Sequence, residues 1–152
     1  MQDIVVYRHT QTIVDFEGVV SLVQSQMAFI GYQQNREEVI SELQNASKDE
    51  SRSVLFVEYS QDMHAIGFAY GNICSGLENQ GDYLYLNELY VSPNHRQHGY
   101  GSRLLEYVQE WSKKVGCVYV AMVTHPDNTQ AQLLYAREGF ELEKLVWVDK
   151  YL

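Results

Sequence analysis

The sequence has only two cysteines, Cys74 and Cys117, and they lie far apart along the chain. Zinc sites and disulfide scaffolds need more cysteines at tighter spacing, so we expect both residues to be free, buried thiols. The five histidines form no HExxH or HxE pattern. They are His9, His64, His95, His98 and His125. The sequence therefore predicts no metal site.

Long apolar segments are also lacking. No apolar run approaches the roughly 20 residues that a membrane-spanning helix needs. The first twelve residues, MQDIVVYRHTQT, contain no basic segment followed by a long apolar block, so we expect no signal peptide. We therefore expect a cytoplasmic protein without a membrane partner.

Basic residues are few: 11 Lys and Arg stand against 20 Asp and Glu, a formal net charge of −9. Nucleic-acid binding needs clustered Lys and Arg, so we expect no nucleic-acid partner. A cationic partner such as a polyamine or an aminoglycoside fits this charge, although many proteins are acidic simply for solubility. The 152 residues, of which 45% are hydrophobic, suit one domain over residues 1–152.

Hydrophobic periodicity predicts alternating helices and strands. We expect strands over residues 3–9, 53–60, 65–74, 83–91 and 117–125, and one or two more over 140–152. We expect helices over residues 12–30, 36–47, 101–115 and 127–138, the last capped by Asp127 and ended by Gly139. The strand over 117–125 is nearly all apolar and should be covered on both faces. The order predicts an α/β (α+β) class with one central sheet covered by helices.

The stretch RQHGYG, residues 96–101, lies between a predicted strand and a predicted helix. Glycines there let the backbone approach a ligand closely, and a helix N-terminus offers unpaired N–H donors that suit an anion such as pyrophosphate. Arg96 and Ser102 could add a positive charge and a hydroxyl donor. Taken alone, the stretch is equally well read as a connecting loop.

Three phosphate-binding patterns compete for this loop. A Walker A loop needs GxxxxGK[ST], and the chain has no GK dipeptide. The dinucleotide pattern GxGxxG fails because Leu104 stands where the third glycine belongs. The remaining pattern, [RQ]xxGx[GA], is matched by Arg96, Gly99 and Gly101.

Further along the chain, NTQAQLLYAREGF fits the pattern N-x-x-A-x-x-L/F-Y-x-x-x-G-F. The matching residues are Asn128, Ala131, Leu134, Tyr135, Gly139 and Phe140. Together with LNELYVSP, RQHGYG, SRLLEYVQEW and VYVAMVT at their spacing, this segment resembles the GNAT family of acetyl-CoA-dependent N-acetyltransferases over residues 83–140. The resemblance implies a GNAT-like fold, with a mixed, mostly antiparallel central sheet flanked by about four helices.

The resemblance also implies an acetyl-CoA site. Backbone groups of Leu89, Tyr90 and Val91 would pair with the pantetheine arm. The pyrophosphate would be held, chiefly by main-chain N–H groups, at Arg96, Gln97, His98, Gly99, Tyr100, Gly101 and Ser102. Asn128 would contact the co-substrate from the next helix. Tyr135 would lie near the sulfur and protonate the leaving thiolate; its alternative role is a half-buried aromatic of a short helix.

The attacking amine must be neutral. A primary alkylamine with a pKa of about 10.4 needs help to lose its proton at pH 7. Glu88, just before the loop, is the candidate base or amine anchor, and its alternative role is a plain edge carboxylate. Strand alternation places the Glu88 side chain on one face of the sheet and the side chains of Asn87 and Leu89 on the other face, unless a bulge intervenes. Some family members place the base one residue earlier, where this chain has Asn87, so the base stays open.

The acceptor site has no motif. We expect it to be lined by the first helix, by its break at IGYQQN and by strands carrying tyrosines. The candidate residues are Glu17, Tyr32, Tyr70, Tyr85 and Glu88, which could form an acidic, aromatic pocket for a cation. Alternatively, Glu17 is solvated and Tyr32 covers the core.

The leading hypothesis is an N-acetyltransferase that transfers acetyl from acetyl-CoA to a small primary amine by direct attack in a ternary complex. Amino-acid derivatives and protein amines remain possible acceptors. The alternatives are an acyl-CoA-binding regulatory module without turnover and an ATP- or NAD-binding domain. A homodimer is possible through the terminal residues KLVWVDKYL.

Overall fold

A five-stranded sheet forms the centre of the computed structural model, which describes residues 3–8, 11–48 and 51–152. The strands lie in chain order, and all neighbours are antiparallel except the parallel pair β4 and β5. They are β1 (Ile4–Tyr7), β2 (Ser53–Tyr59), β3 (Ala65–Gly76), β4 (Gly81–Val91) and β5 (Tyr119–Ala121). The prediction of a mixed, mostly antiparallel sheet is confirmed.

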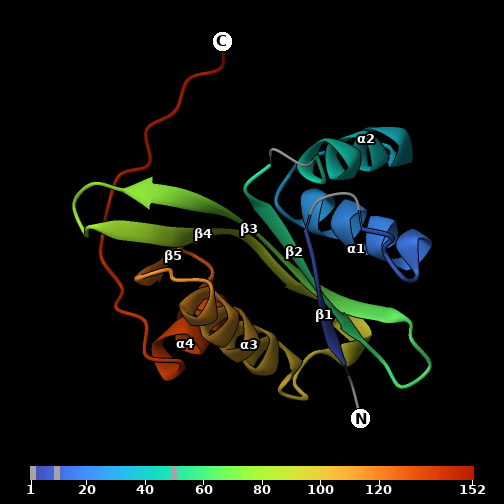
Figure 1. Cartoon of the computed structure of the whole chain (residues 1–152). Coiled ribbons are helices and arrows are strands. Elements are labelled where there is room, and N and C mark those ends of the chain that lie inside the picture. The colour runs from blue at the N-terminus through green and yellow to red at the C-terminus, as the bar shows by residue number, and fades with distance from the viewer. Residues whose placement is uncertain (1–2, 9–10, 49–50) are drawn as a thin grey trace.

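Helices cover both faces of the sheet, with α1 and α2 on one side and α3 and α4 on the other (Figure 1). They are α1 (Phe16–Phe29), α2 (Arg36–Ala46), α3 (Tyr100–Lys114) and α4 (Thr129–Arg137), with a short 3-10 turn η1 (Pro93–His95). The helical periodicity therefore identified each of these four helices. Each layer of helices buries its own apolar cluster against the sheet.

Strand β2 separates the two clusters. All seven of its residues are buried, because both of its faces are covered and both of its edges are paired. Leu55 and Val57 belong to the cluster under α1 and α2, whereas Val54 and Phe56 belong to the cluster under α3 and α4. The alternation of strand side chains thus builds one core on each side of the sheet.

Side-chain caps begin three of the four α-helices in the described part of the chain. Asp15, Asn35 and Asn128 each accept a hydrogen bond from a backbone N–H of the first turn. The prediction of Asp127 as the cap of α4 is wrong by one residue. Helix α3 differs, because its N-cap Gly99 has no side chain to offer.

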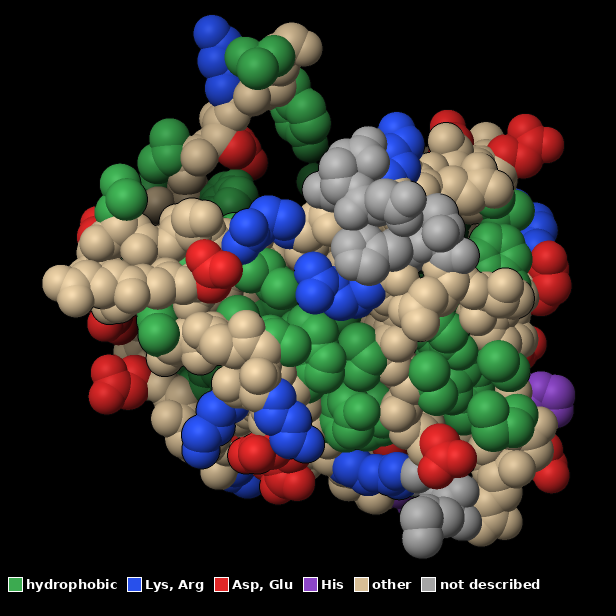
Figure 2. All heavy atoms as spheres, viewed as in Figure 1, with side chains coloured by type: hydrophobic (Ala, Val, Ile, Leu, Met, Phe, Trp, Pro, Cys, Tyr) green, Lys and Arg blue, Asp and Glu red, His purple; other side chains and the backbone are tan. Residues whose placement is uncertain are grey.

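The prediction of strands over residues 140–152 is wrong. This segment, here called the tail, forms no helix or strand and runs past the β3–β4 hairpin to the C-terminus (Figure 1). Phe140 still packs against the core, but further along the tail Leu145, Val146 and Val148 are at least 80% exposed, and the end of the chain projects from the body of the protein (Figure 2). The sequence has the composition of a strand, but a strand also needs a partner edge, and no edge of this sheet pairs with the tail.

Strand β5 is shorter and less covered than predicted. It contains three residues instead of nine, and Tyr119 is 37% exposed, because β5 is the last strand of the sheet and not a central one. Cys74 and Cys117 are free, as expected, but only half-buried. The first strand ends at Tyr7, and the predicted end at His9 lies outside the described residues.

Two further findings apply only to the described residues. No helix there is long and apolar enough to cross a membrane. No group of three or more His, Cys, Asp or Glu side chains there could hold a metal ion.

Candidate active site

Strands β4 and β5 separate partway along β4. They pair only from Tyr83 to Tyr85, whereas β4 remains paired with β3 as far as Val91. Within the described residues, the other edge of β4 therefore has no strand partner beyond Tyr85. An extended ligand with amide groups can add itself to such an edge as a short strand. The edge includes Leu89 and Val91, which were predicted to bind the pantetheine arm.

The loop after β4 leads directly into α3. Gln97 and Gly99 both have left-handed backbones, with φ of 62° and 81°. The first turn of a helix presents N–H groups that no helix carbonyl accepts, together with a partial positive charge. In α3 this turn includes Gly101 and Ser102, while the N–H of Arg103 already donates to the Gly99 carbonyl at 3.0 Å. The arrangement suits an anion.

The same loop lies against α4. A Cβ added to Gly101 would stand 3.5 Å from Cδ2 of Leu134, the residue before Tyr135. The start of α3 is therefore next to the helix that carries the predicted acid. At the other end of the motif, Asn128 uses its Oδ1 to cap α4 through the Ala131 N–H at 3.1 Å. Its amide Nδ2 is thus the group that could donate to a ligand.

Arg96 contacts the protein in three ways. Its Nε donates to the Val91 carbonyl at 2.9 Å, and its guanidinium lies over the rings of Tyr90 and Phe29, 5.2 and 5.9 Å from their centroids. These contacts fasten the loop to β4 and to the end of α1. A role of Arg96 toward phosphate stays a prediction. The ring of His98 hydrogen-bonds the Arg96 carbonyl at 2.7 Å and stacks on Tyr100.

Tyr135 lies on α4 and is 9% exposed, with its ring centroid 6.1 Å from that of Phe140. Burial raises the pKa of its hydroxyl, and the negative charge of Glu88 raises that pKa further. A phenol with a raised pKa keeps its proton at neutral pH, so its hydroxyl is available as a proton donor to a leaving group in the site.

Glu88 owes its position to a bulge in β4. Tyr70 of β3 is opposite Glu88, but the next residue, Gly71, is opposite Leu86, so Asn87 is the extra residue. The bulge places Glu88 on the α1 side of the sheet, with Gln26 Nε2 donating to its Oε2 at 2.8 Å. Burial raises the pKa of the Glu88 carboxyl, and the Gln26 hydrogen bond opposes this rise. A base that titrates closer to neutrality is better matched to proton transfer at pH 7.

The bulge corrects one prediction. Regular alternation would place Asn87 and Glu88 on opposite faces, but Asn87 Oδ1 accepts from Asn72 of β3 at 2.8 Å. Asn72 is opposite Tyr85 on the same face as the Tyr70 and Glu88 pair. Asn87 and Glu88 therefore lie on one face, as successive residues at a β-bulge can.

Comparison with known proteins agrees with this geometry. The family model described as the acetyltransferase (GNAT) family matches residues 19–140. This chain belongs to the GNAT family. Its fold is that of GNAT acetyltransferase structures: it superposes on a solved aminoglycoside N-acetyltransferase, AAC(6')-Iy in complex with CoA, with a TM-score of 0.78. The alignment covers 100% of this chain and 96% of that one at 24% identity, so it supports the fold alone.

Two curated relatives share more sequence with this GNAT chain. One is the aminoglycoside N(6')-acetyltransferase type 1 of Salmonella typhimurium, 34% identical over 57% of this chain and 62% of the relative. Another is the D-amino-acid N-acetyltransferase HPA3 of Saccharomyces cerevisiae, 34% identical over 55% of this chain and 52% of the relative. The matches thus span between half and two thirds of these relatives, whose named acceptors differ.

The predicted acceptor residues are not all brought together. Burial raises the pKa of the Tyr85 hydroxyl, and the charge of the nearby Glu88 carboxylate raises that pKa further. Tyr32, after α1, is 50% exposed, and its hydroxyl is 3.4 Å from that of Tyr151 in the tail. Glu17 lies apart: it is exposed and forms an ion pair with Arg36 of α2. The alternative of a solvated Glu17 is the one observed.

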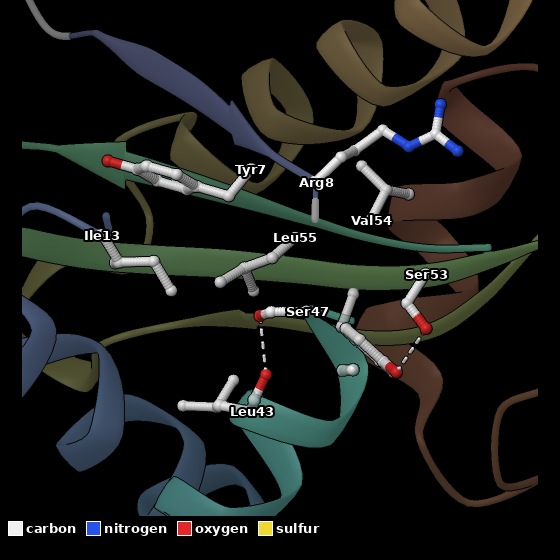
Figure 3. A pocket seen from close by; sticks show the side chains of 10 residues that line it. Tyr7, Arg8, Ile13, Leu43, Ser47, Ser53, Val54 and Leu55 are labelled. Atoms are coloured by element: carbon white, nitrogen blue, oxygen red, sulfur yellow. Dashed lines mark hydrogen bonds between the residues drawn. The ribbon is translucent and has the colours of Figure 1, made fainter. Parts of the chain in front are cut away.

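Tyr70 is opposite Glu88 in the sheet, but its hydroxyl points elsewhere. It donates to Ser53 Oγ at 3.0 Å, and both residues line a small cavity between the sheet and α2 (Figure 3). That cavity has a volume of only about 10 Å³, room for a single water at most. It is therefore not an acceptor pocket.

The sequence did not identify Gln26 as a site residue. It is 8% exposed on the inner face of α1, which also carries Val19 and Leu22. A signal existed, because Gln26 follows these residues at helical spacing and is a polar side chain on an apolar stripe. What the sequence could not show is that β4 brings a carboxylate to the same place.

Proposed function

We propose that this GNAT domain transfers the acetyl group of acetyl-CoA to a primary amine of a small cationic acceptor, by direct attack in a ternary complex. The single observation that supports the proposal is the open edge of β4 beyond Tyr85, where Glu88 lies with Gln26 Nε2 donating to its Oε2 at 2.8 Å. Burial raises the pKa of the Tyr135 hydroxyl and the charge of Glu88 raises that pKa further, which fits a candidate acid near a candidate base.

The residues present fit acetyl-CoA. The open edge of β4 suits the two amides of pantetheine, and the first turn of α3 suits the pyrophosphate. Both features are made by the backbone. The sulfur would then lie between Tyr135 and Glu88, the two groups that the reaction needs on opposite sides of the thioester.

In the proposed reaction, Glu88 accepts a proton from the acceptor ammonium, directly or through a water. The neutral amine attacks the thioester carbonyl carbon, so a C–N bond forms and the C–S bond breaks. Tyr135 donates its hydroxyl proton to the departing sulfur and regains a proton from solvent. The nitrogen gives its extra proton to solvent as the amide forms, and Glu88 also releases its proton to solvent. The products are an acetamide and CoA with a free thiol.

The test is thiol release from acetyl-CoA across a panel of acceptors: an aminoglycoside, a polyamine, a D-amino acid and a lysine peptide. We expect release with a small cationic amine. If acetyl-CoA binds but no amine raises release above background, the domain is a binding module. Release with the peptide alone would assign a protein acceptor, and protection by ATP or NAD but not by CoA would remove the acetyl-CoA site.

We further propose that the tail binds a second copy of this chain. Its apolar side chains are exposed, including Trp147 at 64%, and the outer edge of β5 has no strand partner in the described residues. Exposed apolar segments of this kind mark interaction surfaces. Sedimentation should give a dimer for the full chain and a monomer for a Val146→Lys, Val148→Lys double variant that keeps its fold. A monomeric parent would contradict the proposal.

The compartment we propose is the cytoplasm. Cys74 and Cys117 are half-buried free thiols, which fits a reducing environment. Fractionation of cells that express the tagged protein would test this.

A further inference from the structure

Gln26 is an unusual residue for the inner face of α1. Its neighbours on that face, Val19 and Leu22, are apolar and buried, and Gln26 itself is only 8% exposed. Burying an amide costs free energy unless its hydrogen bonds are made. Gln26 makes one to Oε2 of Glu88, at 2.8 Å and 62 residues further along the chain.

We infer that Gln26 is a positioning residue that holds the Glu88 carboxylate in the orientation needed for proton transfer. This inference rests on the proposed function of Glu88. The hydrogen bond occupies Oε2, and no hydrogen bond from the described residues reaches Oε1. One oxygen is therefore fixed to α1, and the other remains to accept a proton.

The surroundings of Glu88 offer little besides the Gln26 amide to stabilise its negative charge. The titratable residues around Glu88 are Tyr85 on its own strand, Tyr135 on α4 and Tyr70 opposite on β3, whose hydroxyl donates to Ser53 Oγ. Tyrosines carry no charge at neutral pH. Among the described residues no cation forms an ion pair with Glu88. The guanidinium of Arg96, from the loop after β4, lies over the Tyr90 ring. Gln26 is thus the group that stabilises the ionised carboxylate against burial.

Helix α1 supplies a matched control. Gln24, two residues earlier, is a half-buried glutamine whose Nε2 donates to the Gln34 carbonyl at 3.3 Å. Methionine resembles glutamine in size and helix propensity but cannot donate. Gln26→Met therefore removes the donor to Glu88, and Gln24→Met removes a comparable donor elsewhere on the helix.

The experiment measures the pKa of Glu88 directly, by carbon-13 NMR of labelled glutamate carboxyls, with Glu88→Gln to assign the signal. A hydrogen bond to an ionised group is strong enough that Gln26→Met should raise this pKa by about 1, a tenfold change in the proton affinity of the carboxylate. Gln24→Met should leave it unchanged. This readout does not depend on turnover, so it separates the inference from the proposed function.

Kinetics supply the second readout. In Gln26→Met the acid limb of the kcat/KM profile should move to higher pH by the same amount, with full activity regained above it. A purely structural role would instead lower kcat/KM equally at every pH. If Gln26→Met fails to fold, Gln26→Glu replaces it, because two adjacent carboxyls sharing a proton raise the apparent pKa further.

The outcomes are distinct. An unchanged Glu88 pKa in Gln26→Met, or an equal change in Gln24→Met, overturns the inference. A raised pKa in a protein that acetylates no amine supports the positioning role and contradicts the proposed function. A raised pKa with the shifted acid limb supports both.

Discussion

The two faces of the sheet each carry a buried glutamate, and the two glutamates differ in their surroundings. On the α3 side, Glu58 is fully buried, and neither of its oxygens has a hydrogen-bond partner in the described residues. Its nearest described cation contact is Nη1 of Arg103, at 3.7 Å from Oε1. Burial raises the pKa of Glu58 from its ordinary value of 4.5 to about 7, although Arg103 opposes the rise.

On the α1 side, Glu88 is only half-buried, is hydrogen-bonded by Gln26 and faces the place where β4 and β5 separate. Burial raises the pKa of both carboxyls, but only Glu88 can exchange a proton with an incoming molecule. The comparison teaches that a raised pKa alone does not identify a catalytic acid or base. Access and a fixed orientation must accompany it.

Glu88 can act as a base only if acetyl-CoA binds beside it, and Gly99→Asp tests the proposed acetyl-CoA site. In α1, Asp15 is an N-cap with a left-handed backbone, and it accepts from a first-turn N–H. An aspartate at Gly99 can do the same in α3, so it competes for the donors and repels pyrophosphate. Two charges 4 Å apart at an effective dielectric of 20 repel by roughly 4 kcal/mol, so CoA should bind about 1000-fold more weakly. Calorimetric titration measures this.

The matched control is Gly116→Asp. Gly116 also has a left-handed backbone, with φ of 94°, and no atom lies within 4 Å of an added Cβ, as at Gly99. It follows α3 instead of preceding it, so its substitution should leave CoA affinity within about twofold. Equal CoA affinity in the two variants would contradict the proposal that main-chain N–H groups at the start of α3 bind the pyrophosphate.

Glu58→Gln tests the fully buried carboxylate of the comparison. Between pH 4.5 and 7 the unfolded chain loses the Glu58 proton while the folded chain keeps it, so the free energy of unfolding falls as pH rises. The total loss is about 3 kcal/mol. At pH 8 the variant should therefore be more stable than the parent by up to about 3 kcal/mol, and at pH 4 the two should be equal. Urea unfolding at both values measures the difference, with the exposed Glu106→Gln as control.

Glu88→Gln tests the accessible carboxylate. Removing a general base typically costs a factor of about 100 or more, so kcat/KM at pH 7 should fall about 100-fold while CoA affinity is kept. The acid limb of the pH–rate profile should also disappear. A profile of unchanged shape and height would exclude Glu88 as the base.

Tyr135→Phe removes the candidate acid and keeps the ring. We expect kcat to fall at least about tenfold, because the thiolate must then leave without a proton, with CoA affinity within about twofold. Steady-state kinetics and calorimetry measure the two quantities. The control is Tyr107→Phe on α3, since Tyr107 packs against Phe56 outside the site. A kcat within twofold of the parent would exclude Tyr135.

The smallest effect is expected from Glu17→Gln. Glu17 is an exposed carboxylate of α1 that pairs with Arg36, and exposed ion pairs contribute about 0–1 kcal/mol. Acceptor KM should stay within about twofold of the parent, and the free energy of unfolding should fall by no more than about 1 kcal/mol. A large rise in KM would return Glu17 to the acceptor site and weaken the contrast with Glu88.

The sequence predicted the elements around the proposed acetyl-CoA site well, because these elements depend on local features. A strand, a glycine turn and an amphipathic helix follow one another in the chain, and Leu104, Leu105 and Val108 are buried as expected. The surroundings of Glu88, where we propose that the acceptor binds, depend on contacts between distant residues. The Asn87 bulge follows from how β3 pairs with β4, and the Gln26 contact follows from how α1 packs on that pair.

In the tail, the sequence predicted a structure that does not form. Residues 140–152 have the composition of a strand, and pattern alone predicted one, but pairing is a property of two segments and not of one. The error over Asp127 and Asn128 is smaller: both residue types cap helices well, and only the turn before α4 decides between them.

Binding by main-chain N–H groups, as proposed for residues 96–102, also has a consequence for how the sequence of this loop can change during evolution. If the backbone binds pyrophosphate as proposed, the side chains of Gln97, His98 and Ser102 need not be kept, whereas the left-handed backbone at Gly99 must be. A saturation library of this loop should therefore retain function with many different side chains and lose it with almost any replacement of one glycine.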